Sequence, residues 1–413
     1  MALRVMKFGG SSVADAEKIR NVARRIADAR ESGDDVVAVV SARGKTTDGL
    51  VADAMEISER PDPREMDMLL STGERISCAL MAMALHDLGH KAESFTGSQA
   101  GIFTDASHTK AQILEIEPHR LQDSLADGHI VLVAGFQGMS KLDKNVTTLG
   151  RGGSDTTAVA LAAALHADVC EIHSDVTGVF TADPRIEPAA VKLLRITHEE
   201  MLEMAAMGSK VLALRAVEFA RNYDVPLHAR SSFLPNEGTW IIKETPDMEQ
   251  AIVSGIAHRS DEAKLTVTGV RDQPGIAAAI FTALADNLIN VDTILQNTGL
   301  HGHTDLSFTV PLAELGRAKD ALESVRDQLK FEDVLTDDQM GKVTLVGAGM
   351  KSNPGVAAKM FRVLAAENIN IDMIDTSTIR VSVVINRRDV ERAVRALHDA
   401  FDLTSEAARR ANV

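Results

Sequence analysis

The chain has 413 residues, 45% of them hydrophobic and 25% charged, which is long enough for two or three globular domains. Its formal net charge of −15 argues against nucleic acid or an anionic membrane as a partner. Two cysteines, Cys78 and Cys170, are too few for a disulfide framework or a cysteine metal cluster. No apolar run approaches the roughly 18 residues of a membrane span, and the first residues lack the apolar region of a signal peptide, so we expect a cytoplasmic protein.

Short apolar strands alternate with helical segments through residues 1–245. This alternation predicts an α/β domain with a mostly parallel sheet covered by helices on both faces. Substrate loops in such folds lie at the carboxyl ends of the strands. The expected strands are Leu3–Phe8, Asp35–Ser41, Lys91–Phe95, Ile130–Ala134 and Asp168–His173, and the expected helices are Asp15–Glu31, Glu65–Leu88 and Thr156–His166.

Two glycine-rich segments belong at this edge of the sheet. KFGGSS, Lys7–Ser12, follows the first strand, and TTLGRGGSDTT, Thr147–Thr157, leads into a helix. Adjacent glycines let an anion approach the backbone closely, and a helix start offers unpaired N–H groups. Arg151 can bind a carboxylate or phosphate through two hydrogen bonds, and Asp155 can hold Mg²⁺ or orient a polar group. Together the segments predict a site where a lysine and two glycine loops handle a phosphate.

An internal repeat begins near residue 264. Residues 264–294 and 342–374 align at a constant offset from Pro274 and Pro354 onward. Each copy reads as a strand, a Pro-Gly loop, a helix, two strands and a final helix, which we interpret as a βαββαβ unit. We expect the units at residues 264–338 and 342–413, with Asn236–Glu262 as the connection from the first domain.

Five short motifs, followed by the repeated unit, resemble the bacterial aspartate kinases of the actinobacterial type, which are members of the amino-acid kinase family. The resemblance implies a three-layer αβα amino-acid kinase domain and two ferredoxin-like ACT domains. It also implies transfer of the ATP γ-phosphoryl group to the β-carboxylate of L-aspartate, which gives 4-phospho-L-aspartate. That reaction opens the diaminopimelate pathway to lysine, threonine and methionine. The motifs are KFGGSS at Lys7–Ser12, TGERIS at Thr72–Ser77, FTGSQAG at Phe95–Gly101, TTLGRGGSDTTA at Thr147–Ala158 and TADPR at Thr181–Arg185.

The same resemblance assigns roles around the substrate. It makes Lys7, Arg151 and Asp155 catalytic, with Lys7 at the transferring phosphoryl group. Arg151 would clamp the α-carboxylate of aspartate, and Glu74 would pair with its α-ammonium. Without the family, Lys7 could be a solvated strand-end lysine and Glu74 an acidic residue favoured by a helix dipole. The aspartate pocket would also include Ser41, Thr47, Gly152, Gly153 and Ser154.

For the nucleotide, the resemblance implies two groups of residues and Mg²⁺ as cofactor. We expect Mg²⁺ to bind chiefly through ATP oxygens, so we name no protein ligand for it. Phe180 would lie against adenine, and Lys210 would approach the phosphates. The phosphate group is Lys7, Gly9, Gly10, Ser11 and Lys210, and the adenine and ribose group is Ser174, Asp175, Phe180, Asp183 and Arg185.

The ACT domains imply amino-acid effectors and a homo-oligomer. Threonine is the more secure effector, because Thr378 stands where relatives carry a glutamate that can pair with a lysine effector. The alternatives are that the units only dimerise the chain, and that an internal start at Met248 supplies a separate regulatory chain. The resemblance makes Asp272, Gln273, Pro274, Gly275, Asn290 and Gln296 of the first unit face Asn370, Ile371 and Thr376 of the second.

Some residues depart from the family pattern. Thr177 and Phe180 replace other types in the nucleotide segment, and we interpret His173 as a core residue. Arg43 and Lys45 put two positive charges beside the substrate loop. They motivate one alternative, a sister kinase for another acidic metabolite. A second alternative, a catalytically inactive amino-acid sensor, is disfavoured by the intact set of Lys7, Glu74, Arg151 and Asp155.

Overall fold

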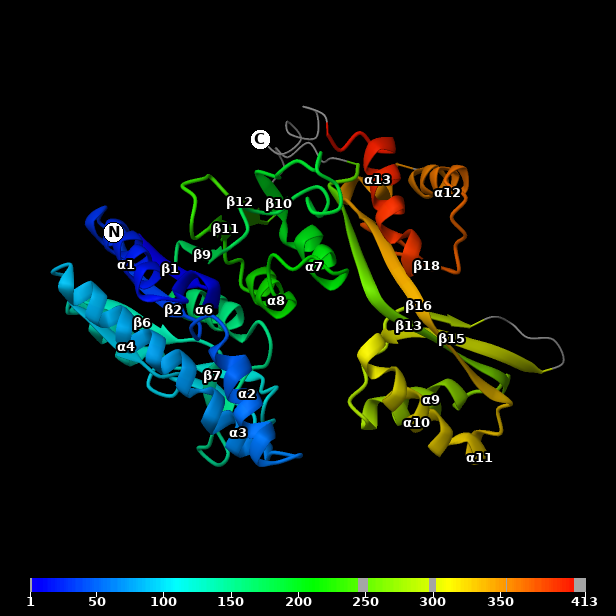
Figure 1. The fold of residues 1–413 in the computed structure, drawn as a ribbon, viewed down its shortest axis with the longest axis horizontal. Helices are drawn as coiled ribbons and strands as arrows, with labels where there is room; N and C mark the ends of the chain where they lie inside the picture. Colours follow the sequence, from blue (N-terminus) through cyan, green and yellow to red (C-terminus); the bar gives the residue numbers. More distant parts are fainter. Residues whose placement is uncertain (1, 244–251, 297–301, 354, 405–413) are drawn as a thin grey trace.

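The computed structural model describes residues 2–243, 252–296, 302–353 and 355–404. The first part of the chain forms one body, coloured blue to green in Figure 1, and the remainder forms a second, coloured yellow to red. The proposed internal start at Met248 lies outside the described residues.

The first body is built on an eight-stranded sheet. All of its pairings are parallel except that of β11 with β12. This confirms the predicted α/β class, and β1 and β6 have the predicted bounds. In sheet order the strands are β10 (Arg195–Thr197), β12 (Thr239–Ile242), β11 (Leu227–Ser231), β9 (Val169–Ser174), β1 (Leu3–Phe8), β2 (Asp35–Val40), β6 (Ile130–Ala134) and β3 (Ala92–Phe95).

Helices cover both faces of this sheet and make three layers. Alternate residues of β1 point to opposite faces, so Val5 packs into the core beneath α6 and Met6 into the core beneath α1. One face is covered by α1 (Ala16–Glu31) and α4 (Thr72–Asp87), and the other by α6 (Gly153–Leu165) and α8 (Leu214–Asn222). The other helices of this body are α2 (Thr46–Ile57), α3 (Pro63–Leu70), α5 (His119–Ala126) and α7 (His198–Ala206).

The segment Glu65–Leu88 was predicted as one helical region, and the structure has two helices there, α3 and α4, within residues 63–87. This stretch is long and apolar enough to cross a membrane by length and composition alone. Half of its most apolar window is buried inside the protein, as in a core helix. A second sheet lies in the same body. The sequence did not predict it, because its strands are too short to show a period. Its order is β5 (Ile113–Ile116), β4 (Ile102–Thr104), β7 (Gln137–Ser140) and β8 (Val146–Thr148).

The repeated units share one six-stranded sheet. Two long strands, β13 and β16, run through both units, with α9, α10 and α11 at one end and α12 and α13 at the other (Figure 1). In order the strands are β14 (Ile294–Gln296), β15 (His303–Pro311), β13 (Gly255–Arg271), β16 (Asp333–Val346), β18 (Arg380–Asn386) and β17 (Met373–Thr376). The helices are α9 (Ile276–Asp286), α10 (Leu315–Ser324), α11 (Arg326–Leu329), α12 (Val356–Ala366) and α13 (Val390–Ala400).

The second unit takes one strand from outside residues 342–413. Residues 255–259 of β13 pair with residues 342–346 of β16, while the later part of β13 belongs to the first unit. The second repeat in the sequence lacks this strand, because residues 255–259 come before the first repeat. The segment Asn236–Glu262 is therefore more than a connection, since it contains β12 and the start of β13.

Polar contacts join the first body to the second unit. The Glu200 carboxylate on α7 accepts hydrogen bonds from Ser254 Oγ at 2.5 Å and from the Ala348 N–H at 3.1 Å. Arg380 on β18 lies 3.1 Å from Glu203 on α7 and 2.5 Å from Asp375 on β17. The edge of the six-stranded sheet is thereby linked through one guanidinium to a helix of the first body.

Candidate active site

A cavity of about 710 Å³ opens at the carboxyl ends of β1 and β2, beside the start of α6. Lys7, Glu74, Arg151 and Asp155 all line it. Lys7 Nζ lies 2.5 Å from Asp155 Oδ1, and each residue is only 9% exposed. The structure therefore brings the residues predicted as catalytic, Lys7, Arg151 and Asp155, into one cavity with Glu74, which was predicted to bind the substrate. The predicted residues Gly10, Ser41, Thr47, Gly152, Gly153 and Ser154 line it as well.

Two glycines shape this cavity. A Cβ at Gly10 would lie 2.7 Å from the carbonyl oxygen of Ala42, so glycine is needed where the two loops touch. Gly152, the residue before α6, has a φ of 73°, which favours glycine. The helix begins at Gly153, three residues earlier than the predicted start at Thr156. The positive end of the α6 dipole therefore lies at the cavity wall, where it favours an anion.

Glu74 is a buried carboxylate in this wall. It is 3% exposed, and its Oε1 accepts a hydrogen bond from the Ala42 N–H at 3.1 Å. Within the part of the chain that the structure describes, its Oε2 is buried without a hydrogen-bond partner. Burial raises the pKa of Glu74 to about 7, and the hydrogen bond from Ala42 offsets only part of that effect. An unpaired buried carboxylate of this kind is suited to receive the ammonium group of a ligand.

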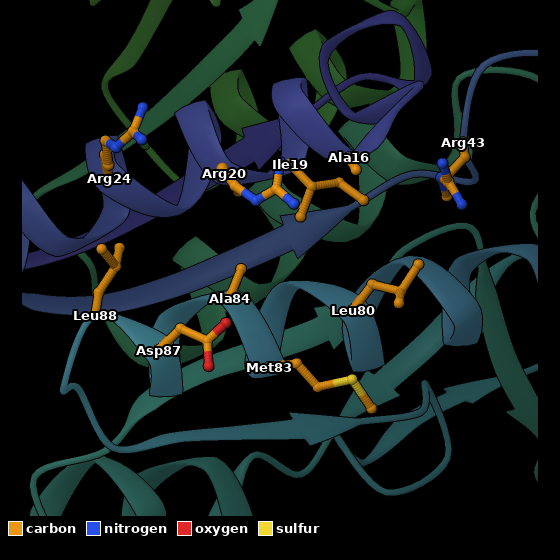
Figure 2. A pocket seen from close by; sticks show the side chains of 10 residues that line it. All are labelled: Ala16, Ile19, Arg20, Arg24, Arg43, Leu80, Met83, Ala84, Asp87 and Leu88. Atoms are coloured by element: carbon orange, nitrogen blue, oxygen red, sulfur yellow. The ribbon is translucent and has the colours of Figure 1, made fainter.

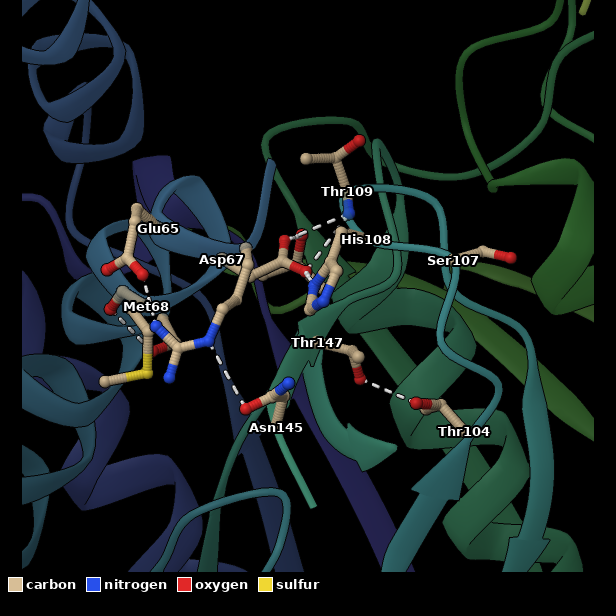
Figure 3. A network of polar contacts seen from close by, with 12 residues as sticks. Glu65, Asp67, Met68, Thr104, Ser107, His108, Thr109, Asn145 and Thr147 are labelled. Carbon is tan, nitrogen blue, oxygen red and sulfur yellow. Dashed lines mark hydrogen bonds and ion pairs between the residues drawn. The ribbon is translucent and has the colours of Figure 1, made fainter. Parts of the chain in front are cut away.

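Asp67 organises the opposite wall and was missed by sequence reasoning. Its carboxylate is fully buried and accepts hydrogen bonds from His108 Nδ1 at 2.6 Å and the Thr109 N–H at 3.1 Å (Figure 3). It also accepts one from Thr148 Oγ1 at 2.5 Å. Thr109, Lys110 and Thr148 line the cavity. Asp67 thus ties α3 to two segments of the cavity wall. The available signal was a carboxylate placed among the methionines and leucines of EMDMLL.

Of the predicted nucleotide residues, Lys7 and Gly10 line this cavity and the others lie outside it. Ser174 ends β9, next to β1, so it lies at the same sheet edge as Gly9. Asp183 and Arg185 form an ion pair at 2.6 Å, and the Arg185 guanidinium lowers the pKa of Asp183. Lys210 is exposed. Eight predicted nucleotide residues are absent from the lining of this cavity in the described part of the chain: Gly9, Ser11, Ser174, Asp175, Phe180, Asp183, Arg185 and Lys210.

The two unusual positive charges do not reach the cavity. Arg43 lines a separate groove of about 320 Å³ between α1 and α4, together with Arg20, Ile19 and Leu80 (Figure 2). Its guanidinium donates to the carbonyl of Ala14 at 3.3 Å. Lys45 is exposed at the residue before α2. Because Arg43 and Lys45 do not line the cavity, they no longer support the alternative of a kinase for another acidic metabolite.

His173 is a core residue, as expected. It is fully buried, stacks on Phe8 with ring centroids 4.7 Å apart, and its Nε2 lies 2.8 Å from Glu171 Oε2. Burial lowers the pKa of His173.

The predicted effector residues do not face one another within the chain. In the first group, residues 272–275 follow β13, Asn290 precedes β14 and Gln296 ends it. In the second group, Asn370 and Ile371 precede β17 and Thr376 ends it, and β14 and β17 are the two opposite edges of the six-stranded sheet. A single chain therefore does not bring the two groups together, because its sheet runs continuously through both units. Asp272, Gln273, Pro274, Gly275, Asn290, Gln296, Asn370 and Thr376 are exposed, and Ile371 is half-buried.

Comparison with known proteins agrees with this architecture. The amino acid kinase family matches residues 2–231, and the ACT domain family matches residues 265–325 and 343–401. An aspartokinase of Mycolicibacterium smegmatis is 56% identical over 408 residues, which cover 98% of this chain and 97% of that protein.

Solved structures show the same fold. The chain is 27% identical to E. coli aspartokinase III in complex with aspartate and ADP in the R-state, with a TM-score of 0.79. The match covers 96% of this chain and 99% of that one. The T-state of the same enzyme, in complex with lysine and aspartate, matches with 27% identity, a TM-score of 0.72 and the same coverage. The chain belongs to the amino acid kinase family and, within it, to the aspartokinases that carry ACT domains.

Proposed function

We propose that the 710 Å³ cavity is where this aspartokinase transfers the γ-phosphoryl group of ATP to the β-carboxylate of L-aspartate. The observation that carries this assignment is the meeting of Lys7, Glu74, Arg151 and Asp155 in one cavity. Arg151 would hold the α-carboxylate through paired hydrogen bonds, and Glu74 would hold the α-ammonium. These two contacts select an α-amino acid and direct its side-chain carboxylate inward.

The chemical step needs positioning and neutralisation of charge. One β-carboxylate oxygen attacks the γ-phosphorus, the bond to the β–γ bridging oxygen breaks, and ADP leaves. The nucleophile is already ionised at neutral pH, so no general base is required. Lys7 would stabilise charge on the transferred phosphoryl group, and the 2.5 Å ion pair with Asp155 would hold its ammonium in place.

The nucleotide and its ion fit the neighbouring sheet edge. Ser174, Asp175, Phe180, Asp183 and Arg185 would hold adenine and ribose, with Gly9, Gly10, Ser11 and Lys210 on the phosphates. Mg²⁺ neutralises phosphate charge when it is bound with ATP. Asp155, ion-paired with Lys7 at 2.5 Å, would orient that ammonium toward the phosphate oxygens.

Regulation would act through oligomers formed at the exposed sheet edges. Ile294 on β14 is 52% exposed and Ile374 on β17 is 47% exposed, and apolar edge strands of this kind pair readily with another chain. A second copy could bring the first group of effector residues of one chain against the second group of its partner. The contact of Arg380 with Asp375 and Glu203 would carry the effect to the kinase domain.

Threonine is the effector that we propose first. Thr378 replaces the acidic partner of a lysine side chain, and loss of such a partner costs on the order of a few kcal/mol. Inhibition by threonine, alone or with lysine, is expected at lower concentrations than inhibition by lysine alone. Potent inhibition by lysine alone in initial-rate measurements would contradict this choice. We place the enzyme in the cytoplasm, where these metabolites are made.

The decisive test is formation of aspartyl hydroxamate from aspartate, hydroxylamine, ATP and Mg²⁺. Lys7→Ala should lower kcat by about a hundredfold or more, as loss of a donor to a developing charge does. Lys18→Ala, at a half-buried lysine on α1, is the matched control and should leave kcat unchanged. Equal kcat values for the two variants would refute the assignment of the cavity. An ADP-release screen with glutamate and N-acylated analogues tests the sister-kinase alternative.

A further inference from the structure

A cluster of three potential metal ligands lies between the kinase domain and the second regulatory unit. Glu187 belongs to the segment between β9 and β10, while His398 and Asp399 are adjacent on α13. Each residue has a ligand atom within 4.8 Å of a ligand atom of the other two. Glu187 is 7% exposed, His398 is fully buried and Asp399 is exposed. None of them lines the catalytic cavity.

The His398 imidazole is poised as a ligand. Its Nε2 lies 2.9 Å from Thr181 Oγ1, and its Nδ1 is buried without a hydrogen-bond partner in the described part of the chain. In the tautomer that carries its proton on Nε2, His398 donates to Thr181 Oγ1 and keeps a lone pair on Nδ1. A buried nitrogen with a free lone pair destabilises the folded chain unless it gains a partner.

Thr181 is placed as the outer partner of such a ligand. Metal-binding histidines commonly donate their second N–H to an oxygen, which fixes the tautomer and the ring orientation. Thr181 Oγ1 is itself held by the Val191 N–H at 2.9 Å. Glu187 is held in a similar way, because its Oε1 accepts a hydrogen bond from the Ala189 N–H at 2.8 Å. The segment of the kinase domain from Thr181 to Val191 therefore orients two of these side chains, Glu187 within it and His398 in contact with it.

We propose that Glu187, His398 and Asp399 bind one divalent transition-metal ion, with Zn²⁺ as the best match. One imidazole nitrogen and two carboxylate oxygens suit Zn²⁺ better than Mg²⁺ or Ca²⁺, which prefer oxygen ligands alone. Three protein ligands leave a fourth position for water.

The ion would join two parts of the enzyme that are distant in sequence. Thr181 and Glu187 flank Asp183 and Arg185, and α13 packs in the core of the second unit. A bound ion would hold this segment against the regulatory unit and stabilise the folded chain in proportion to its affinity.

Metal binding can be measured directly on the full chain after removal of metals with a chelator. Zn²⁺ is titrated in competition with a chromophoric chelator, and Co²⁺ is added separately to record its visible absorption bands. We expect one ion per chain. Asp399→Asn and Glu187→Gln should each raise the Kd for Zn²⁺ at least about tenfold and alter the Co²⁺ spectrum.

The control is Glu391→Gln, which removes another exposed carboxylate of α13 and should leave the Kd unchanged. His398→Gln should abolish Co²⁺ absorption from a nitrogen ligand, and Asp399→Asn at an exposed position serves if that variant does not fold. Absence of Zn²⁺ binding at micromolar concentrations, or the same Kd in the ligand variants and the control, would overturn the proposal.

Discussion

Replacement of Glu74 by glutamine should stabilise the kinase domain while it weakens substrate binding. The Glu74 carboxyl is nearly fully buried, and its pKa is raised from 4.5 to about 7. Glutamine keeps an oxygen that can accept the hydrogen bond from Ala42, but it carries no charge at any pH. The substitution therefore removes the cost of burying a carboxylate and also removes the partner of the substrate ammonium.

The size and sign of the effect follow from the pKa shift. Between pH 4.5 and pH 7 the folded chain binds more protons at Glu74 than the unfolded chain does, so the free energy of unfolding falls as pH rises. From pH 5 to pH 8 this fall amounts to roughly 2–3 kcal/mol. The Glu74→Gln variant lacks this fall. Its free energy of unfolding should therefore exceed that of the parent by the same amount at pH 8 and by little at pH 5.

Denaturant unfolding at the two pH values measures this difference. The single tryptophan, Trp240, lies on β12 and stacks on His228 with ring centroids 4.0 Å apart, so its fluorescence reports on the kinase domain. In the parent enzyme, KM for aspartate should rise about tenfold per pH unit below pH 7, as Glu74 is protonated. The variant should have a KM that is higher by roughly 30-fold or more and independent of pH in this range. A stability gain equal at pH 5 and pH 8 would refute the reasoning.

Three other substitutions test the contacts around the site and between the domains. Asp67→Asn replaces an acceptor of several buried hydrogen bonds, so it should cost about 1–3 kcal/mol of stability and raise KM for aspartate, while Asp53→Asn at an exposed position should do neither. Arg380→Gln should leave the uninhibited kcat unchanged and raise the threonine concentration for half-inhibition several-fold, and an unchanged inhibition curve would separate this contact from regulation. Ile374→Lys on the edge strand β17 should reduce the mass measured by light scattering, whereas Leu142→Lys on an exposed loop of the kinase domain should not.

Local features of the sequence were sufficient for the core of the kinase domain. The run Ile130–Ala134 is continuously apolar and Leu3–Phe8 is apolar apart from Arg4 and Lys7, because both faces of a parallel strand are buried, and the bounds of both strands were predicted correctly. The glycine pairs after β1 and before α6 indicated an anion site, and the repeated Pro-Gly segment indicated the regulatory units. These features depend on residues close together in the chain.

Tertiary structure decided what depends on contacts between distant segments. Asp67 is a functional candidate only because the chain brings Thr109 and Thr148 against it, and Arg43 is excluded from the cavity only because its side chain turns toward α1. The strand at residues 255–259 completes a unit that begins some eighty positions later. Hydrophobic period and glycine spacing tell how a segment folds, but they carry no information about its partners, because pairing is set by the packing of the whole chain.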